Sequence, residues 1–99
     1  MTSKDETDAV KLWTVEFDDR ARRELRKLDT PTQQTILRYL RERVAGSPDP
    51  RQFGKPLRKK LAGLWRYRIG DYRLICRLEE GRLVVFVIRV GHRPEIYEE

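Results

Sequence analysis

The sequence predicts a single α+β domain in the order β-α-α-β-β-β, with a mostly antiparallel four-stranded sheet and a helical hairpin on one face. Three observations predict this fold class. An alternating segment comes first, two segments with apolar residues at helical spacing follow, and three alternating segments separated by turn sequences complete the chain. With 99 residues the chain has room for one domain. We therefore expect residues 1–10 to be a disordered leader and residues 11–99 to form the domain.

The first half of the chain contains the predicted strand and helical hairpin. Residues 11–17 alternate and predict a strand, and Asp18 is well placed to cap a helix after it. Thr30 and Pro31 favour the start of a second helix, with Thr30 as its cap and Pro31 at its first position. Because the link between the two helices is so short, they are expected to pack antiparallel.

The second half of the chain contains a basic connector at residues 51–63 and then three predicted strands. The strands span residues 64–69, 72–79 and 82–90. The first two are separated by Gly70-Asp71 and the last two by Glu80-Gly81. Both pairs have the composition of two-residue hairpin turns, so tight hairpins are expected at each.

The register of the first hairpin places arginines opposite each other. If Gly70 and Asp71 form the turn, Arg68 lies directly opposite Arg73. Alternation then puts aromatic and apolar residues under the helices, and leaves Arg66, Arg68, Arg73 and Arg77 on the opposite face. Like charges opposite each other in a ladder are unfavourable by up to about 1 kcal/mol, unless an anion lies between them. The cluster therefore indicates a phosphate-binding site; the alternative is a solvated face whose arginines pair with carboxylates from a loop.

The composition narrows the class of partner and of site. Lys and Arg number 22 against 16 for Asp and Glu, a net charge of +6 that favours RNA, DNA or an acidic protein as partner. The single Cys76 excludes an internal disulfide and a cysteine-based zinc site, and is expected to be a small core residue. No metal-ligand cluster is evident, so neither a metal nor another cofactor is expected. No apolar run approaches the roughly 20 residues needed to cross a bilayer, and we expect a cytoplasmic protein without membrane association.

The tail after the last predicted strand adds groups suited to proton transfer. His92, the only histidine, and Arg93 follow that strand where a loop can bend toward the arginines. Imidazole titrates near neutral pH, which suits a general acid or base. An isolated surface histidine is the alternative interpretation. Tyr97 can stack on a base or donate its hydroxyl.

The span from about Trp13 to Tyr97 resembles the RelE/ParE superfamily of toxins from bacterial and archaeal toxin–antitoxin pairs, and the RelE branch more closely. Besides the order of elements, three motifs carry the resemblance: Gly54-Lys55-Pro56-Leu57; Gly63-Leu64-Trp65-Arg66-Tyr67-Arg68 with Gly70-Asp71-Tyr72-Arg73-Leu74; and Val90-Gly91-His92-Arg93 through Tyr97. RelE-like proteins cleave messenger RNA, commonly in the ribosomal A site, and are silenced by an antitoxin. The resemblance implies three partners: messenger RNA, the ribosome, and a RelB-like antitoxin that wraps an amphipathic helix around the toxin.

The resemblance also implies roles for individual residues. Catalytic roles fall on Arg68, Arg73, His92, Arg93 and Tyr97. The residues expected to bind RNA phosphates around them are Arg66, Lys55, Arg58 and Arg77. Arg66 and Arg68 stand where the best-studied members have lysine, and His92 stands where some relatives have lysine.

The implied reaction is metal-independent attack of the ribose 2′-OH on its own phosphate, which leaves a 2′,3′-cyclic phosphate. It requires a base, positive charge around the phosphorane and an acid on the leaving oxygen. Because arginine does not lose its proton in a protein, Arg68 is expected to position the phosphate that is cleaved and to neutralise its charge. Proton transfer then falls to His92 and Tyr97, and which is base or acid stays open.

Two other functions stay open from sequence. One is a ParE-like inhibitor of DNA gyrase without nuclease activity, and the other is a catalytically inactive RNA-binding module. The arginine cluster and Tyr97 favour the nuclease, because a gyrase inhibitor does not need them.

Overall fold

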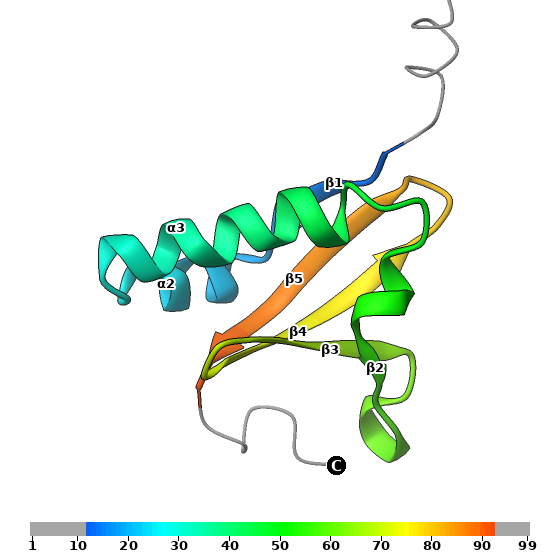
Figure 1. Ribbon diagram of the computed structural model, residues 1–99. Helices are drawn as coiled ribbons and strands as arrows, with labels where there is room; N and C mark the ends of the chain where they lie inside the picture. Colours follow the sequence, from blue (N-terminus) through cyan, green and yellow to red (C-terminus); the bar gives the residue numbers. More distant parts are fainter. Residues whose placement is uncertain (1–11, 93–99) are drawn as a thin grey trace, which may run out of the picture.

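A computed structural model describes residues 12–92 of the chain; the expected leader at residues 1–10 lies outside the described residues. Two helices cover one face of a five-stranded sheet whose strand order is β1-β5-β4-β3-β2 (Figure 1). The elements are β1 (Thr14–Phe17), α2 (Asp19–Arg26), α3 (Thr30–Arg38), β2 (Lys55–Pro56), β3 (Leu64–Ile69), β4 (Tyr72–Glu79) and β5 (Val84–Gly91). The α+β class and the helical hairpin are confirmed.

The expected four-stranded sheet has one strand more than the sequence indicated. The additional strand is the two-residue β2, which lies inside the basic connector and pairs antiparallel with β3, so that Lys55 is opposite Arg66. Gly54 makes this approach possible, because a Cβ at that position would lie 2.8 Å from the ring of Tyr67. The short segment shows no alternation, since two residues are too few to display a period. The sheet is otherwise antiparallel, except that β1 pairs parallel with β5.

The helices begin at acidic caps. Asp18 caps α2 by accepting a hydrogen bond from the Arg20 amide, as predicted. The prediction that Thr30 caps α3 is wrong by one residue: Asp29 accepts from the Thr32 amide and hydroxyl, and Thr30 is already helical. Beyond Arg38 the helix continues as a π-helical segment, Tyr39–Val44.

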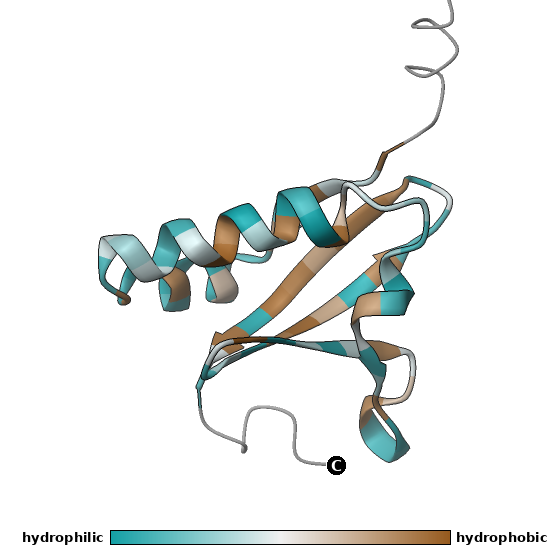
Figure 2. Cartoon of the chain, in the orientation of Figure 1, coloured by the Kyte–Doolittle hydropathy of each residue, from teal (hydrophilic) through white to brown (hydrophobic). Residues whose placement is uncertain are grey.

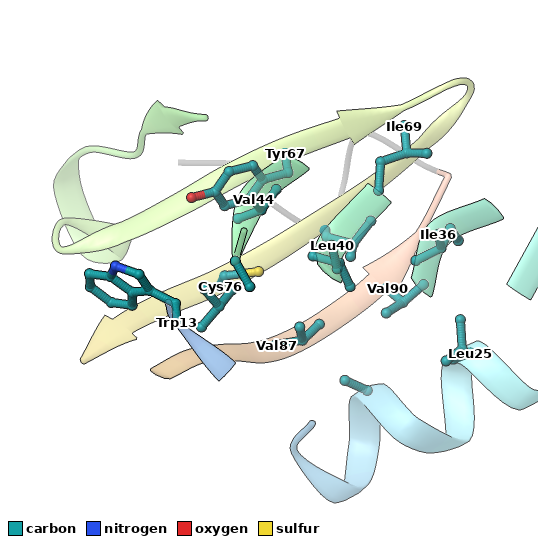
Figure 3. Packing of buried hydrophobic residues seen from close by; sticks show 14 residues of the cluster. Trp13, Leu25, Ile36, Leu40, Val44, Tyr67, Ile69, Cys76, Val87 and Val90 are labelled. Carbon is teal, nitrogen blue, oxygen red and sulfur yellow. The ribbon is translucent and has the colours of Figure 1, made fainter. Parts of the chain in front are cut away.

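The hydrophobic core lies between the helices and one face of the sheet. Tyr67, Leu74 and Cys76 on this face are fully buried, in one cluster with Ile36 and Leu40 of the second helix and its π-helical continuation. Figure 3 shows Tyr67, Cys76, Ile36 and Leu40 in this layer. The strand β5, which lies between β1 and β4, is hydrophobic along most of its length (Figure 2). The predicted core face of the β3–β4 hairpin is thus confirmed, and Cys76 is a core residue.

The two hairpin turns differ from each other. Gly70-Asp71 forms the predicted two-residue turn, with Gly70 at φ +61°, which fixes the β3–β4 register as predicted. The expected two-residue turn at Glu80-Gly81 is wrong. Two consecutive turns instead span residues 80–83, where the amides of Arg82 and Leu83 bond back to the carbonyls of Glu79 and Glu80. The last strand therefore begins at Val84 rather than at residue 82.

Candidate functional site

The sheet face opposite the helices carries two adjacent rows of residues at one end. The first row crosses four strands, with Lys55, Arg66, Ile75 and Arg89 in register. The second row places Arg68, Arg73 and Gly91 in register. Directly paired residues share a face, so the basic side chains of both rows start from the same face, which we call the arginine face.

Arg68 and Arg73 are paired across the β3–β4 hairpin, as the sequence predicted. The side chain of Arg68 is exposed, and no ion pair between described residues uses it. Arg73 is half-buried, and its Nη1 donates a hydrogen bond to the backbone carbonyl of His92 at 3.0 Å. The structure thus joins two of the predicted catalytic residues, and holds a second arginine directly beside them. Two guanidinium groups in this arrangement can neutralise a phosphate that lies between them.

His92 lies at the rim of the sheet, just after β5. Its exposed ring lies against the ring of Tyr72, with centroids 5.3 Å apart and planes tilted by 31°. Tyr72 packs against the core on the helix side, whereas Arg73 starts from the arginine face. The backbone carbonyl of His92 therefore contacts Arg73 of the arginine face, whereas the His92 ring contacts the ring of Tyr72.

Glu24 of α2 fixes the end of β5 that leads to His92. Its Oε1 accepts the Val90 amide at 2.7 Å, and its Oε2 accepts Nε of Arg89 at 3.0 Å. The parallel strand β1 ends at Phe17, opposite Val87, so it does not reach the Val90 amide. At this edge of the sheet, where no strand lies beside Val90, a helix side chain accepts the hydrogen bond of its backbone amide.

The other predicted phosphate ligands are placed less uniformly. Arg77 starts from the same face but lies toward the opposite end of the sheet, where Glu79 accepts its Nε and Nη2 and its guanidinium lies 4.9 Å from the centre of the Phe86 ring. Of the two interpretations of the arginine cluster, Arg77 therefore matches the one in which an arginine pairs with a carboxylate of the protein. Lys55 is exposed at the edge of the sheet beside Arg66, whose Nε is shielded from solvent, and Arg58 is exposed in the loop after β2. Arg93 and Tyr97 lie outside the described residues.

Three residues of this region carried no sequence signal. Alternation in the sequence predicts only that Tyr72 faces the helices, and its contact with His92 depends on where the chain turns after β5. Arg89 would face the core in an unbroken strand, so its place on the arginine face depends on a β-bulge. Glu24 looks like one more charged residue on the polar side of a helix, and its partners lie 65 and 66 residues away.

Two further findings concern residues 12–92. Within that range, no group of three or more His, Cys, Asp or Glu side chains is arranged to hold a metal ion. None of the helices there has the length and apolar character to cross a membrane.

Comparisons with known proteins add independent information. The sequence-family model that describes the ParE toxin of type II toxin–antitoxin systems matches residues 15–97 of this chain. Toxin RelG of Mycobacterium tuberculosis is 38% identical over 85 residues, which cover 86% of this chain and 95% of that protein. The mRNA interferase toxin RelE of Escherichia coli K12 is 34% identical, with 86% of this chain and 90% of that protein covered.

Solved structures give the same result for the fold. A chain in the crystal structure of the toxin–antitoxin complex RelBE2 from Mycobacterium tuberculosis superposes with a TM-score of 0.76 at 35% identity. The superposition covers 83% of this chain and 99% of that one. A chain of the intact RelBE toxin–antitoxin complex from Escherichia coli has a TM-score of 0.64 at 26% identity, with 82% and 96% covered.

Proposed function

This chain belongs to the ParE toxin family of type II toxin–antitoxin systems, and from that premise we propose that it is an endoribonuclease that cleaves messenger RNA. It is a toxin of a RelBE-type toxin–antitoxin pair. The observation that carries the proposal is the pairing of Arg68 with Arg73 across the hairpin, where Arg73 also donates a hydrogen bond to the backbone carbonyl of His92. The relative in Escherichia coli that bears the name mRNA interferase supports it.

The proposed reaction is attack of a ribose 2′-OH on the adjacent phosphate, with departure of the 5′-oxygen and formation of a 2′,3′-cyclic phosphate. Arg68 and Arg73 neutralise the phosphate oxygens as negative charge builds up on them in the transition state. Arg93 adds to this charge, and Arg66, Lys55 and Arg58 hold the flanking RNA. Arg77 is the weakest member of this set, because Glu79 already holds its guanidinium.

Proton transfer in this mechanism falls to His92 and Tyr97. One takes the proton of the 2′-OH and the other supplies a proton to the leaving oxygen. The His92 ring is exposed at the rim of the sheet, and its backbone carbonyl accepts a hydrogen bond from Arg73, which supports the proposal that a ribose beside the bound phosphate meets this ring. No metal ion takes part.

The proposed partners follow from the same assignment. A RelB-like antitoxin silences the toxin by wrapping an amphipathic helix around it, and structures of related toxins with antitoxins support this partner. The substrate is messenger RNA, cut in the ribosomal A site. The proposal implies a cytoplasmic protein.

Replacement of Arg73 or Arg93 by alanine tests the assignment. Both variants should lose RNA cleavage and growth arrest while they keep the fold, measured by primer extension on translated and free messenger RNA and by circular dichroism. Arg82→Ala is the control, because Arg82 is an exposed arginine of the distant 80–83 turn, paired with Glu79 and Glu16. Wild-type cleavage by both test variants would refute a nuclease site here.

A separate measurement addresses His92. The His92→Gln variant should bind RNA or ribosomes as the wild type does, yet cleave much more slowly, by the 10²–10⁴-fold typical of a lost general acid or base. If the variant cleaves at the wild-type rate, His92 has no part in proton transfer.

The second candidate function is inhibition of DNA gyrase. The name of the matching family model, ParE toxin, is the observation that favours it. A supercoiling assay run beside a translation assay separates the two, since a gyrase inhibitor should block supercoiling and leave messenger RNA intact.

A further inference from the structure

A β-bulge in β5 turns Arg89 onto the arginine face. Val85 and Val87 point into the core, and an unbroken alternation would send residue 89 to the core as well. Instead Ile75 pairs with Arg89 and the next residue of β4, Cys76, pairs with Val87, so Ile88 is an extra residue on β5. Arg89 consequently starts in the same cross-strand row as Arg66.

Glu24 holds the guanidinium of Arg89 by only one of its donors. Arginine has five N–H donors in a fixed plane, and Glu24 accepts the one on Nε. No described residue accepts from Nη1 or Nη2, although the side chain is only a quarter exposed (25%). The end of the guanidinium fork therefore remains open for an acceptor with two oxygens in one plane.

Gly91 leaves space between Arg89 and the arginine pair. It lies directly opposite Arg73 and two residues after Arg89, so it belongs to the same face as both. Because glycine has no side chain, Ile75 is the one side chain that stands beside both arginines in the strand register. Successive phosphates of a single strand can approach this part of the face closely.

We propose that Arg89 binds a second RNA phosphate, next to the phosphate held by Arg68 and Arg73, and that Glu24 is the positioning residue for its guanidinium. The inference rests on the proposed nuclease function and names a further ligand of the same site. Arginine suits this role because its two Nη groups bind two phosphate oxygens at once. Glu24 keeps the fork oriented before RNA arrives, which reduces the entropy lost on binding.

The glutamine variant of Arg89 separates binding from structure. Gln places an amide N–H where Arg89 has Nε, so the bond to Glu24 can persist while the charged Nη groups are removed. Glu24 also keeps a cationic neighbour, since Nε of Arg20 lies 3.6 Å from its Oε2. Arg82→Gln is the matched control, because it removes the same charge from the 80–83 turn.

The readout is RNA affinity as a function of salt concentration, measured with an oligonucleotide that has a 2′-deoxyribose at the cleavage position. Arg89→Gln should weaken binding about tenfold, equivalent to about 1.4 kcal/mol. It should also lower the slope of log K against log salt by about 0.7, the value for one phosphate contact on a single strand. Arg82→Gln should leave both unchanged. Equal affinity and slope for the two variants would overturn the proposal.

Steady-state cleavage by Arg89→Gln distinguishes this role from a catalytic one. KM should rise while kcat stays close to wild type, because the second phosphate is not the one that reacts. Glu24→Ala should weaken binding as well, and combining it with Arg89→Gln should add little, since both act through one guanidinium. Fully additive losses would show that Glu24 does not act through Arg89.

The proposal can fail independently of the nuclease assignment. If the wild type binds but does not cut RNA, the nuclease function fails while the salt slope still reports on Arg89. If Arg89→Gln does not fold, NMR of the wild-type side chain decides, since the Nε–Hε and Nη signals of Arg89 should shift when the uncleavable RNA is added. Unshifted Arg89 signals at saturating RNA would refute the contact.

Discussion

Arg68 shows how one side chain restricts the chemistry of the site. Its guanidinium keeps its proton at any pH at which a protein is folded, and its exposed position opposite Arg73 makes it an electrostatic group. A lysine in the same place can lose a proton when other cations crowd it. The identity of this residue thus moves the proposed proton chemistry to His92 and Tyr97.

Substitution of Arg68 tests this division of roles. Arg68→Ala should lower kcat by about 10²–10³-fold, as for loss of one group that stabilises developing charge. Arg68→Lys should retain most activity and leave the pH–rate profile of cleavage unchanged in shape, because the positive charge alone is needed. The assignment also implies that His92→Gln removes one titration from the pH–rate profile of cleavage. If Arg68→Lys introduces a new titration that takes the place of that one, the assignment is wrong.

At the scale of elements, β2 depends on a contact between a glycine and an aromatic ring. The Tyr67 side chain is completely buried, and its hydroxyl donates a hydrogen bond to the Pro50 carbonyl at 2.9 Å. A Cβ on Gly54 would lie within 3 Å of two ring atoms of Tyr67, which cannot move away easily. This packing brings Lys55 beside Arg66 and extends the arginine face by one strand.

Gly54→Ala should therefore destabilise the fold. The backbone at Gly54 has φ −122°, which alanine adopts freely, so the cost is steric. We expect a loss of about 1–3 kcal/mol in the free energy of unfolding, the usual cost of overpacking. Gly81→Ala is the control, because a Cβ there has open space around it. Urea unfolding of both variants measures the difference, and equal stability would show that Tyr67 yields without cost.

The far end of the sheet is held by a network around Glu79. Arg77 and Arg82 both donate to its carboxylate, and Arg82 also reaches Glu16 of β1. These bonds join β4 and the 80–83 turn to β1, which lies on the other side of β5 in the sheet. The network explains why Arg77, predicted to bind phosphate, is paired within the protein.

This network predicts a pH dependence of stability. Hydrogen bonds from Arg77, and then from Arg82, hold the pKa of Glu79 below its ordinary value of 4.5. A carboxylate whose pKa is lower in the folded state stabilises the fold above its unfolded pKa and loses that contribution as the pH falls through its folded pKa. The wild type should therefore be more stable than Glu79→Gln at pH 6–7, and this advantage should vanish toward pH 3. A difference that is independent of pH would contradict the network's role.

At the scale of the whole molecule, the sheet separates two environments. One face packs on the helices and encloses the core, and the other presents the basic rows at one end and the Glu79 network at the other. Cys76 lies at the centre of the first environment and is completely shielded from solvent. Burial raises the pKa of its thiol above the ordinary value, which disfavours the reactive thiolate.

Cys76 consequently reports on unfolding of the entire domain. A thiol reagent at pH 8 should label it only when the core opens, so the labelling rate should follow the global unfolding equilibrium as urea is added. Intact mass measurement of labelling beside tryptophan fluorescence of unfolding provides the comparison. Labelling in the absence of denaturant that is faster than global opening allows would reveal local exposure of the strand.

Local sequence patterns were enough to predict the order of the elements apart from β2, the core face of the β3–β4 hairpin and the opposition of Arg68 to Arg73. These follow from alternation and a two-residue turn, which act over a few neighbouring residues. Three features depend on the assembled fold: β2 joins the sheet, the bulge at Ile88 turns Arg89 onto the arginine face, and Glu24 accepts the amide at the end of β5. Each of these depends on backbone groups left unpaired at a strand edge, or on side chains that meet from distant parts of the chain. Such contacts form only once the sheet is assembled, and local sequence patterns carry no record of them.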